Sequence, residues 1–282
     1  MILPGVPTRW KPRKVECTED RAHTDFPGDL YAVKFVRTDN NNEQARSAGM
    51  CISELVSAGV MQTIGFRGLE PVLVLASQEF AQSCVQDGTF DYGISVGYHF
   101  GTRFRHDLSP GPPERVDQLA DPAEVLRLWV IDCWLLNCDR QLSGNVMMSP
   151  DGKGQWHLVA SDHSDCFLGA DCFSTERYLV DGPRFGIVSY LSLAEEVVLD
   201  HDGMQAVTES FDPISKCAQG IRSITECVPE EWWERAGIDA EKLEWFLQQR
   251  AEQIPMICDP RRWEGMQDAV RNGYQLKLDD LQ

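Results

Sequence analysis

Two different periods of apolar residues run along the chain, and together they predict a mixed α+β protein. Alternation over Leu30–Val36 predicts a strand on which Lys34 shares a face with Ala32 and Val36. The continuous apolar run Pro71–Ala76 predicts a strand that is buried on both faces. Two further strands are expected at Lys14–Cys17 and Tyr92–Gly97. The part of the chain before residue 105 is therefore expected to form a small sheet with one helix.

Helical spacing begins between these strands and dominates the second half of the chain. Cap residues at Asn40–Asn42 precede Glu43–Thr63, whose apolar stripe is bordered by Glu54. The segment Val125–Leu136 is apolar on nearly all faces, which predicts a central buried helix that begins after an N-cap at Asp121. Later helices are expected at Tyr190–Leu199, His201–Ile221 and Asp239–Gln253, the last of them stopped by Pro255.

A hairpin is predicted directly after the buried helix. The turn Asp151–Gly154 separates two apolar runs, Val146–Met148 and Trp156–Ala160. Such a hairpin would bring Asn145 and Asp162, which lie just outside the two runs, together at its open end.

The polar residues around this hairpin have the chemistry of a phosphoryl-transfer site. A reaction of this kind needs a proton acceptor, oxygen ligands for Mg²⁺ and cations for the phosphates. Asp139 can accept the proton of a hydroxyl group, and Asn145 and Asp162 offer the hard oxygen atoms that Mg²⁺ prefers. Lys34 can supply the cation, with Glu54 as its partner. The sequence therefore predicts one site made of these five residues.

Each of these residues also has a structural interpretation when it is taken alone. A loop Asp or Asn is most often a cap or a turn former, and a lysine on a strand commonly protects a sheet edge. A glutamate beside an apolar stripe can simply be solvated. The functional interpretation depends on the joint pattern of buried helix, polar loop and hairpin. Asp132, inside the buried helix, is expected to bond to loop backbone and to brace the Asp139 turn rather than to act in catalysis.

The same segments resemble the HipA-like kinases, whose core plan is shared with phosphoinositide and protein kinases. The residues that carry the resemblance are Asn137–Arg140, Gly144–Asn145, Asp162–His163, Phe167, Tyr31–Phe35, Glu54–Leu55 and His99–Phe104. The resemblance implies a two-lobed protein-kinase-like fold that uses ATP and Mg²⁺ to transfer the γ-phosphate to a hydroxyl group, most plausibly on a protein Ser or Thr. It also implies a protein substrate and an antitoxin-like regulator as partners.

By the same resemblance each candidate residue receives a role. Lys34 would hold the nucleotide phosphates and Glu54 would pair with Lys34. Asp139 would be the catalytic base, while Asn145 and Asp162 would hold Mg²⁺. The expected division is an N-terminal nucleotide-binding lobe at 1–104, a linker at 105–121 rich in Pro, and a helical catalytic lobe at 122–282.

Two features of the sequence keep other functions open. Asn145 follows Asp139 by six positions, whereas the kinase pattern has five, and the connector Thr18–Asp29 contains a single glycine, Gly28. A nucleotide-binding pseudokinase that acts as a regulatory module is therefore an alternative. A kinase that phosphorylates a lipid or a small molecule is another.

Composition narrows the possible partners. The formal net charge of −18 and the pI near 4.7 disfavour nucleic acids and anionic membranes, because both are polyanions. There is no apolar run of membrane-spanning length, so a cytoplasmic protein is expected. The ten cysteines include no C-x-x-C pair, which predicts reduced, mostly buried thiols and no structural zinc.

Overall fold

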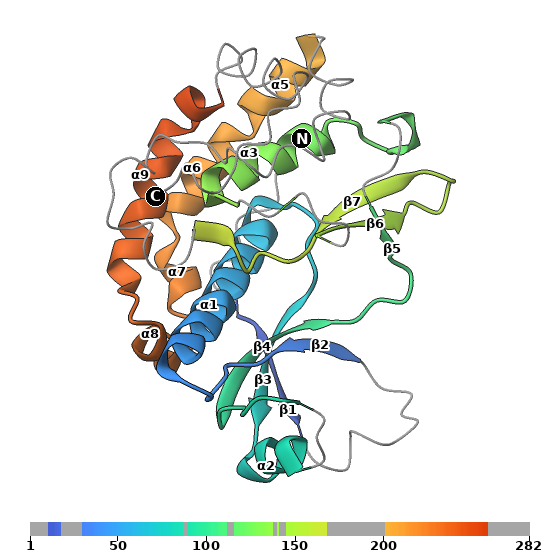
Figure 1. Ribbon diagram of the computed structural model, residues 1–282. Coiled ribbons are helices and arrows are strands. Elements are labelled where there is room, and N and C mark those ends of the chain that lie inside the picture. Colours follow the sequence, from blue (N-terminus) through green and yellow to red (C-terminus); the bar gives the residue numbers. More distant parts are fainter. Residues whose placement is uncertain are drawn as a thin grey trace, which may run out of the picture.

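The computed structural model describes residues 11–17, 30–86, 90–111, 116–137, 140, 145–167 and 201–258. Its amino-terminal part is rich in strands and its carboxy-terminal part is helical, with the long helix α1 lying between them (Figure 1). The α+β fold class expected from the sequence is confirmed, with a small strand-rich part and a larger helical part.

A four-stranded sheet forms the amino-terminal part. Its strands are β1 (Arg13–Cys17), β2 (Tyr31–Lys34), β3 (Pro71–Ala76) and β4 (Gly97–Arg103), in the order β1-β3-β4-β2. β1 runs parallel to β3, and the other two pairings are antiparallel. β3 and β4 therefore form the centre of the sheet, and β2, which carries Lys34, lies at an edge beside β4.

Helix α1 (Asn41–Ile64) crosses from this sheet into the helical part. The side chain of Asn40 caps it by accepting a hydrogen bond from the Glu43 amide at 3.0 Å. Gly65 ends it in the left-handed conformation, with φ 77°. Fourteen of its residues are buried, Glu54 among them, because both parts of the protein pack against it.

The predicted hairpin is present and belongs to a second, three-stranded sheet. β6 (Val146–Pro150) pairs with β7 (Trp156–Ala160), and the two-residue strand β5 (Ser109–Pro110) lies on the other side of β6. The carboxylate of Asp151 organises the turn by accepting hydrogen bonds from the Lys153 and Gln155 amides.

The described helical part consists of α3 and the segments α5 to α9. Their bounds are α3 Glu124–Leu135, α5 His201–Glu209, α6 Phe211–Gln219, α7 Arg222–Thr225, α8 Glu230–Ala236 and α9 Ala240–Ile257. Of the described helices, none is long and apolar enough to cross a membrane.

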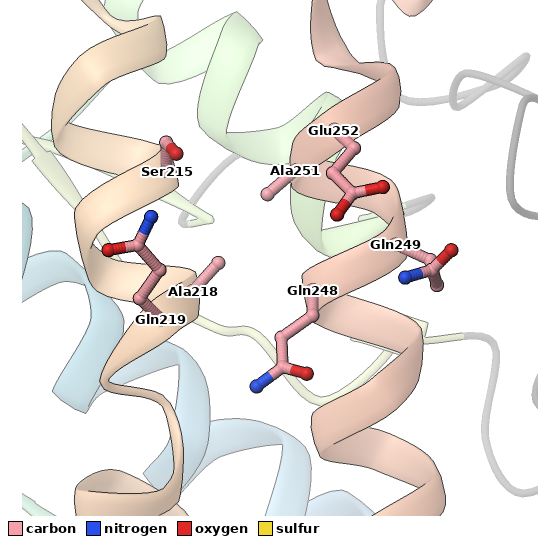
Figure 2. Close-up of a pocket in the computed structure, with 7 residues that line it drawn as sticks. All are labelled: Ser215, Ala218, Gln219, Gln248, Gln249, Ala251 and Glu252. Carbon is pink, nitrogen blue, oxygen red and sulfur yellow. The ribbon is translucent and has the colours of Figure 1, made fainter.

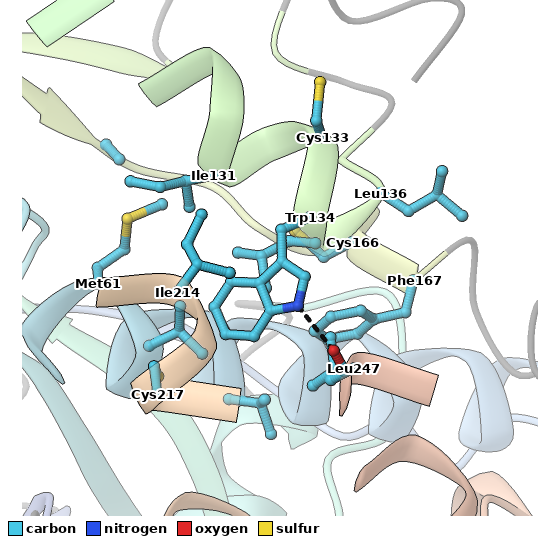
Figure 3. Packing of buried hydrophobic residues seen from close by; sticks show 14 of the residues in the cluster. Met61, Ile131, Cys133, Trp134, Leu136, Cys166, Phe167, Ile214, Cys217 and Leu247 are labelled. Carbon is cyan, nitrogen blue, oxygen red and sulfur yellow. Dashed lines mark hydrogen bonds between the residues drawn. The ribbon is translucent and has the colours of Figure 1, made fainter. Parts of the chain in front are cut away.

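One apolar cluster joins α1, α3 and the C-terminal helices, and Figure 3 shows its centre. Trp134 of α3 is fully buried there, and its indole nitrogen donates to the Leu247 carbonyl oxygen at 2.9 Å. Met61 of α1 and Ile214 of α6 contribute to the same cluster. Since the indole donor is satisfied, the large ring is buried without an unpaired polar group.

Several details differ from the expectations. The strand expected at Tyr92–Gly97 is wrong, because β4 begins only at Gly97 and Ile94 makes an isolated bridge to Arg37. Tyr92 and Ile94 of that segment instead pack in a small cluster with Phe35. Helix α2 (Gln78–Gln86) was not expected.

Helix boundaries differ near prolines and at one cap. The helix expected at His201–Ile221 is divided at Ser210, three residues before Pro213, which lacks the amide that would continue the ladder. The last helix passes through Pro255 and ends at Ile257. Asp121 bonds to the Ala123 amide at 3.0 Å, but α3 itself begins at Glu124.

The segment expected to be an irregular linker contains β5 within its described residues. Ser109 and Pro110 pair with Met148 and Met147, and proline is tolerated because β5 is an edge strand. The connector Thr18–Asp29 and the helix expected at Tyr190–Leu199 lie outside the described residues.

Candidate active site

The ammonium group of Lys34 is the centre of the candidate site. Its Nζ lies 2.5 Å from Glu54 Oε1 and 2.5 Å from Asp162 Oδ1. The Lys34 side chain is 35% exposed, whereas Glu54 is 4% exposed. The partners come from three distant segments: the sheet edge, the middle of α1 and the end of the hairpin. The ion pair expected between Lys34 and Glu54 is present, and Asp162 joins it.

The strand that holds Lys34 is fixed by a buried histidine of β4. His99 Nδ1 accepts a hydrogen bond from the Val36 amide at 3.0 Å, and its Nε2 donates to the Ser95 carbonyl oxygen at 2.9 Å. Both ring nitrogens are engaged, so the imidazole is held in one neutral tautomer. Burial lowers the pKa of His99 to about 4, which keeps the ring neutral at physiological pH.

Asp162 lies two positions after the end of β7, and its carboxylate points at Lys34. Its φ of 49° lies in the left-handed region, which an aspartate tolerates better than most residues. The Ser164 hydroxyl donates to Asp162 Oδ1 at 2.6 Å. Burial opposes the charge of Asp162, but the bonds from Lys34 and Ser164 outweigh it and lower the pKa of the carboxyl well below its ordinary value. Asp162 is therefore an anion at neutral pH.

The charge of Lys34 is maintained in the same way. Burial disfavours the ammonium form, but the nearby Glu54 and Asp162 carboxylates outweigh burial and raise the pKa of Lys34 above its ordinary value. Lys34 also donates to the Ser164 hydroxyl at 3.3 Å. A permanently charged, partly exposed ammonium group is well suited to bind phosphate.

Asn145 lies at the open end of the hairpin, as expected. Its carbonyl oxygen accepts a hydrogen bond from the Ser161 amide at 3.2 Å, one residue before Asp162. Asn145 is 6% exposed. The hairpin therefore brings the backbones of both predicted metal ligands to one place.

Arg140 connects helix α3 with both ends of the hairpin, a role that was not predicted from the sequence. Its side chain is fully buried and makes a two-pronged pair with Asp132, with Nε–Oδ2 at 3.0 Å and Nη2–Oδ1 at 2.9 Å. Its Nη1 donates to the carbonyl oxygens of Asn145, Ser161 and Asp162. The sequence shows Arg140 only as a charged loop residue. Its position beside Asp139, in the segment Asn137–Arg140 that resembles HipA-like kinases, was the one available signal.

The carboxylate of Asp132 bonds to the side chains of Asn137 and Arg140. The bonds that were expected from Asp132 to loop backbone stay a prediction, because most of that loop lies outside the described residues. These two residues flank Asp139 in the sequence. Asp139 itself lies outside the described residues, so its predicted role as base stays a prediction.

Glu54 has a second neighbour besides Lys34. The His163 amide donates to Glu54 Oε2 at 3.0 Å, and His163 Nδ1 lies 3.6 Å from the same oxygen. His163 is 4% exposed, and its Nε2 has no hydrogen-bond partner among the described residues. Glu54 therefore holds Lys34 on one side and the backbone after Asp162 on the other.

The residues present fit a magnesium ion better than a transition metal. An ionised, partly exposed Asp162 beside Asn145 offers oxygen donors, which Mg²⁺ takes from one or two protein groups while phosphates and waters complete its shell. Within the described residues there is no group of three or more His, Cys, Asp or Glu side chains that could hold a metal ion. The site could therefore hold Mg²⁺ that arrives with a phosphorylated ligand.

A pocket of about 340 Å³ lies elsewhere, between α6 and α9 (Figure 2). It is lined by Ser215, Ala218, Gln219, Gln248, Gln249, Ala251 and Glu252. None of these residues belongs to the elements that hold Lys34 and its partners. Since the lining contains no cation, this pocket is a poor place for a nucleotide phosphate.

Comparisons with known proteins show little. No protein-family model matches the sequence, and no curated protein matches it. Among solved structures, the chain is similar to the crystal structure of a Helicobacter pylori proinflammatory kinase, CtkA, with a TM-score of 0.45 and 12% identity. The match covers 85% of this chain and 92% of that chain. A likeness at this level does not show what this chain does.

Proposed function

We propose that the protein is a kinase that transfers the γ-phosphate of ATP, together with Mg²⁺, to a hydroxyl group. One observation supports this above all: the ammonium group of Lys34 lies within 2.5 Å of both Glu54 and Asp162. A lysine on a strand, paired with a helix glutamate and facing an aspartate that follows a later strand, is the arrangement with which kinases hold ATP.

Each residue has one task in this proposal. Lys34 positions the nucleotide phosphates, and Glu54 holds Lys34 in place. Asp139 orients the acceptor hydroxyl and accepts its proton. Asp162 and Asn145 are the groups that hold Mg²⁺, which when bound neutralises the charge that develops on the phosphate oxygens.

The ion cluster gives a physical reason for a metal requirement. The ammonium group of Lys34 neutralises the Asp162 carboxylate at 2.5 Å. A phosphate that took Lys34 for itself would leave the Asp162 carboxylate close to another anion, and the two would repel each other. Nucleotide and metal are therefore expected to bind together. The Lys34 ammonium group would then pair with the phosphates, and the metal ion would pair with Asp162.

A protein Ser or Thr is the proposed acceptor, on the resemblance to HipA-like kinases. The net charge of −18 argues against an anionic lipid headgroup. The antitoxin-like regulator has the same basis and remains an expectation. The cytoplasmic location, expected because the sequence has no apolar run of membrane-spanning length, also remains an expectation. A nucleotide-binding pseudokinase is the second candidate, and the six-position spacing from Asp139 to Asn145 favours it.

Transfer of labelled phosphate separates these candidates. The purified protein is incubated with γ-labelled ATP, Mg²⁺ and a cell lysate, and the label is followed into protein, lipid and the chain itself. Label in proteins that disappears with Asp162→Ala supports the proposal. Binding of Mg-ATP without transfer to any acceptor would identify a pseudokinase, and label confined to lipid would change the acceptor.

A further inference from the structure

Arg140 and Asp132 form a buried ionic pair that no step of the proposed reaction uses. The Arg140 side chain is 0% exposed and the Asp132 side chain is 5% exposed. Burying two charges costs free energy that their attraction offsets only when the geometry is good and the remaining donors are satisfied. An apolar pair of the same volume would serve the core at least as well, so this pair calls for an explanation beyond packing.

The Nη1 group of Arg140 is directed to the backbone of the two predicted metal ligands and of Ser161. Nη1 donates to the Asn145 carbonyl oxygen at 2.6 Å and to the Asp162 carbonyl oxygen at 3.4 Å, and it also bonds to the Ser161 carbonyl oxygen. Asn145 precedes β6 and Asp162 follows β7, so a single planar group joins both ends of the hairpin. Only arginine can make these bonds while keeping a two-pronged contact with a carboxylate.

The other end of the pair is anchored in α3. Asp132 lies in the last turn of that helix, and its Oδ1 accepts hydrogen bonds from Arg140 and from the Asn137 amide group at 3.1 Å. Leu136 ends the helix in the left-handed conformation, with φ 51°. The guanidinium group of Arg140 is therefore held by a carboxylate of the buried helix.

From these contacts we infer that Arg140 is a positioning residue that holds Asn145 and Asp162 at the spacing a metal ion requires. The inference depends on the proposed function, because it assigns Arg140 to the same metal site. Arg140 acts through the backbone of the two ligands and touches neither nucleotide nor metal. Its loss should weaken the use of Mg²⁺ without removing the phosphate-binding charge of Lys34.

The chain provides a matched control in Arg250 of α9. Its side chain is also fully buried and also donates to carbonyl oxygens of α3, with Nε to Trp134 at 2.8 Å and Nη2 to Cys133. Both of these acceptors belong to α3 and not to the hairpin that carries Asn145 and Asp162. Arg140→Lys and Arg250→Lys should therefore lose comparable stability, but only the first should disturb the metal site.

The test measures ATP binding by calorimetry as a function of Mg²⁺ concentration, and again with EDTA, for wild type and both variants. Arg140→Lys should raise the half-saturating Mg²⁺ concentration about tenfold, which is the effect of losing an outer partner of a metal ligand, and change the EDTA affinity less than twofold. Arg250→Lys should change neither. Equal Mg²⁺ requirements in the two variants would overturn the inference while leaving the function intact. A wild type that does not bind Mg-ATP would instead overturn the proposed function and, with it, this role.

A measurement on the wild type keeps the inference open to disproof if Arg140→Lys does not fold. If Arg140 fixes the two ligands in advance, the Ser161 amide, which bonds to the Asn145 carbonyl oxygen, should exchange hydrogen without ligand as slowly as the Ala160 amide of β7. Rapid exchange at Ser161 that becomes slow only with Mg-ATP would show that the ligand, and not Arg140, orders this end of the hairpin.

Discussion

At the scale of single residues, Lys34 holds two carboxylates of different exposure. Glu54 is 4% exposed and Asp162 is 38% exposed, and each has an oxygen 2.5 Å from Lys34 Nζ. Such a cluster contributes to stability, since removing the cation leaves two anions close together. Its contribution must depend on pH in a defined direction.

We predict that the stability difference between wild type and Lys34→Met is largest near neutral pH. The pKa of Asp162 is lowered by folding, so its contribution is present above about 4, the unfolded value, and is lost as the pH falls further. The pKa of Lys34 is raised, so its contribution is lost only above about 10.4. Urea unfolding of both proteins between pH 3 and 7 measures the difference.

Lys216→Met is the control for this experiment. Lys216 also has a carboxylate at 2.5 Å, from Asp212, but both side chains are more than half exposed, at 56% and 67%. Exposed pairs of this kind contribute little. The control should show a small, pH-independent difference. If Lys34→Met behaved in the same way, the cluster would have no role in stability.

Replacing Asp139 and replacing Asp162 are predicted to have different effects on nucleotide affinity and phosphate transfer. Asp162→Ala removes a metal ligand, so both Mg-dependent nucleotide affinity and turnover should fall. Asp139→Ala removes a proton acceptor, so affinity should survive while transfer drops by about two to four orders of magnitude. Calorimetry and single-turnover transfer measure the two effects. Unchanged transfer in Asp139→Ala would show that another group is the base.

At the scale of elements, the position of α1 decides whether Glu54 can reach Lys34. Helix α8 packs along α1, and Trp232 of α8 donates its indole hydrogen to the Tyr98 carbonyl oxygen of β4 at 2.8 Å. Figure 1 shows α8 close to the start of α1. Helix α8 therefore contacts both α1 and β4 and helps to hold α1 against the sheet.

We predict that Trp232→Phe weakens nucleotide binding as well as stability. The lost bond leaves a Tyr98 carbonyl without its donor, at a cost of about 1–3 kcal/mol, and a loosened α1 moves Glu54 away from Lys34. A change of about 1 kcal/mol in binding would be roughly fivefold in Mg-ATP affinity. Thermal unfolding and calorimetry measure the two quantities.

Trp134→Phe is a matched control, because Trp134 is equally buried and donates to the Leu247 carbonyl oxygen at 2.9 Å. It should lose similar stability with little change in nucleotide affinity. If both variants lost affinity in proportion to stability, α8 would have no particular role in the site.

The elements that the sequence predicted well are those with a local signal. Alternation located β2 and its lysine, and the turn Asp151–Gly154 located the hairpin that brings Asn145 and Asp162 together. Tyr92–Gly97 was misassigned because Tyr92 and Ile94 belong to a small side-chain cluster, and a short apolar run of this kind has the same composition as a buried strand.

Arg140 could not have been placed by local reasoning. Its backbone acceptors lie between five and 22 positions away, and backbone oxygens carry no sequence signal. The same holds for the contact of Trp232 with β4, 134 positions apart, which only the folded chain creates. Contacts between residues this far apart in the sequence cannot be predicted from a local pattern, although they hold the site residues together.

At the scale of the whole molecule, the sheet and the helices share one core. The same apolar cluster contains Leu73 and Phe100 of the sheet, Leu55 of α1 and Phe246 of α9. The two parts are therefore expected to unfold together. Far-ultraviolet circular dichroism and tryptophan fluorescence should give one coincident urea transition. Two separate transitions would show that the parts at 1–104 and 122–282 are independent domains.

The central claim is that the Lys34 cluster binds ATP together with Mg²⁺. Calorimetric titration of the wild-type protein with Mg-ATP, repeated with ATP and EDTA, tests it most directly. The claim predicts saturable heat with Mg-ATP, much weaker binding in EDTA, and loss of the Mg-dependent part in Asp162→Ala. No heat from Mg-ATP at millimolar concentration would contradict it.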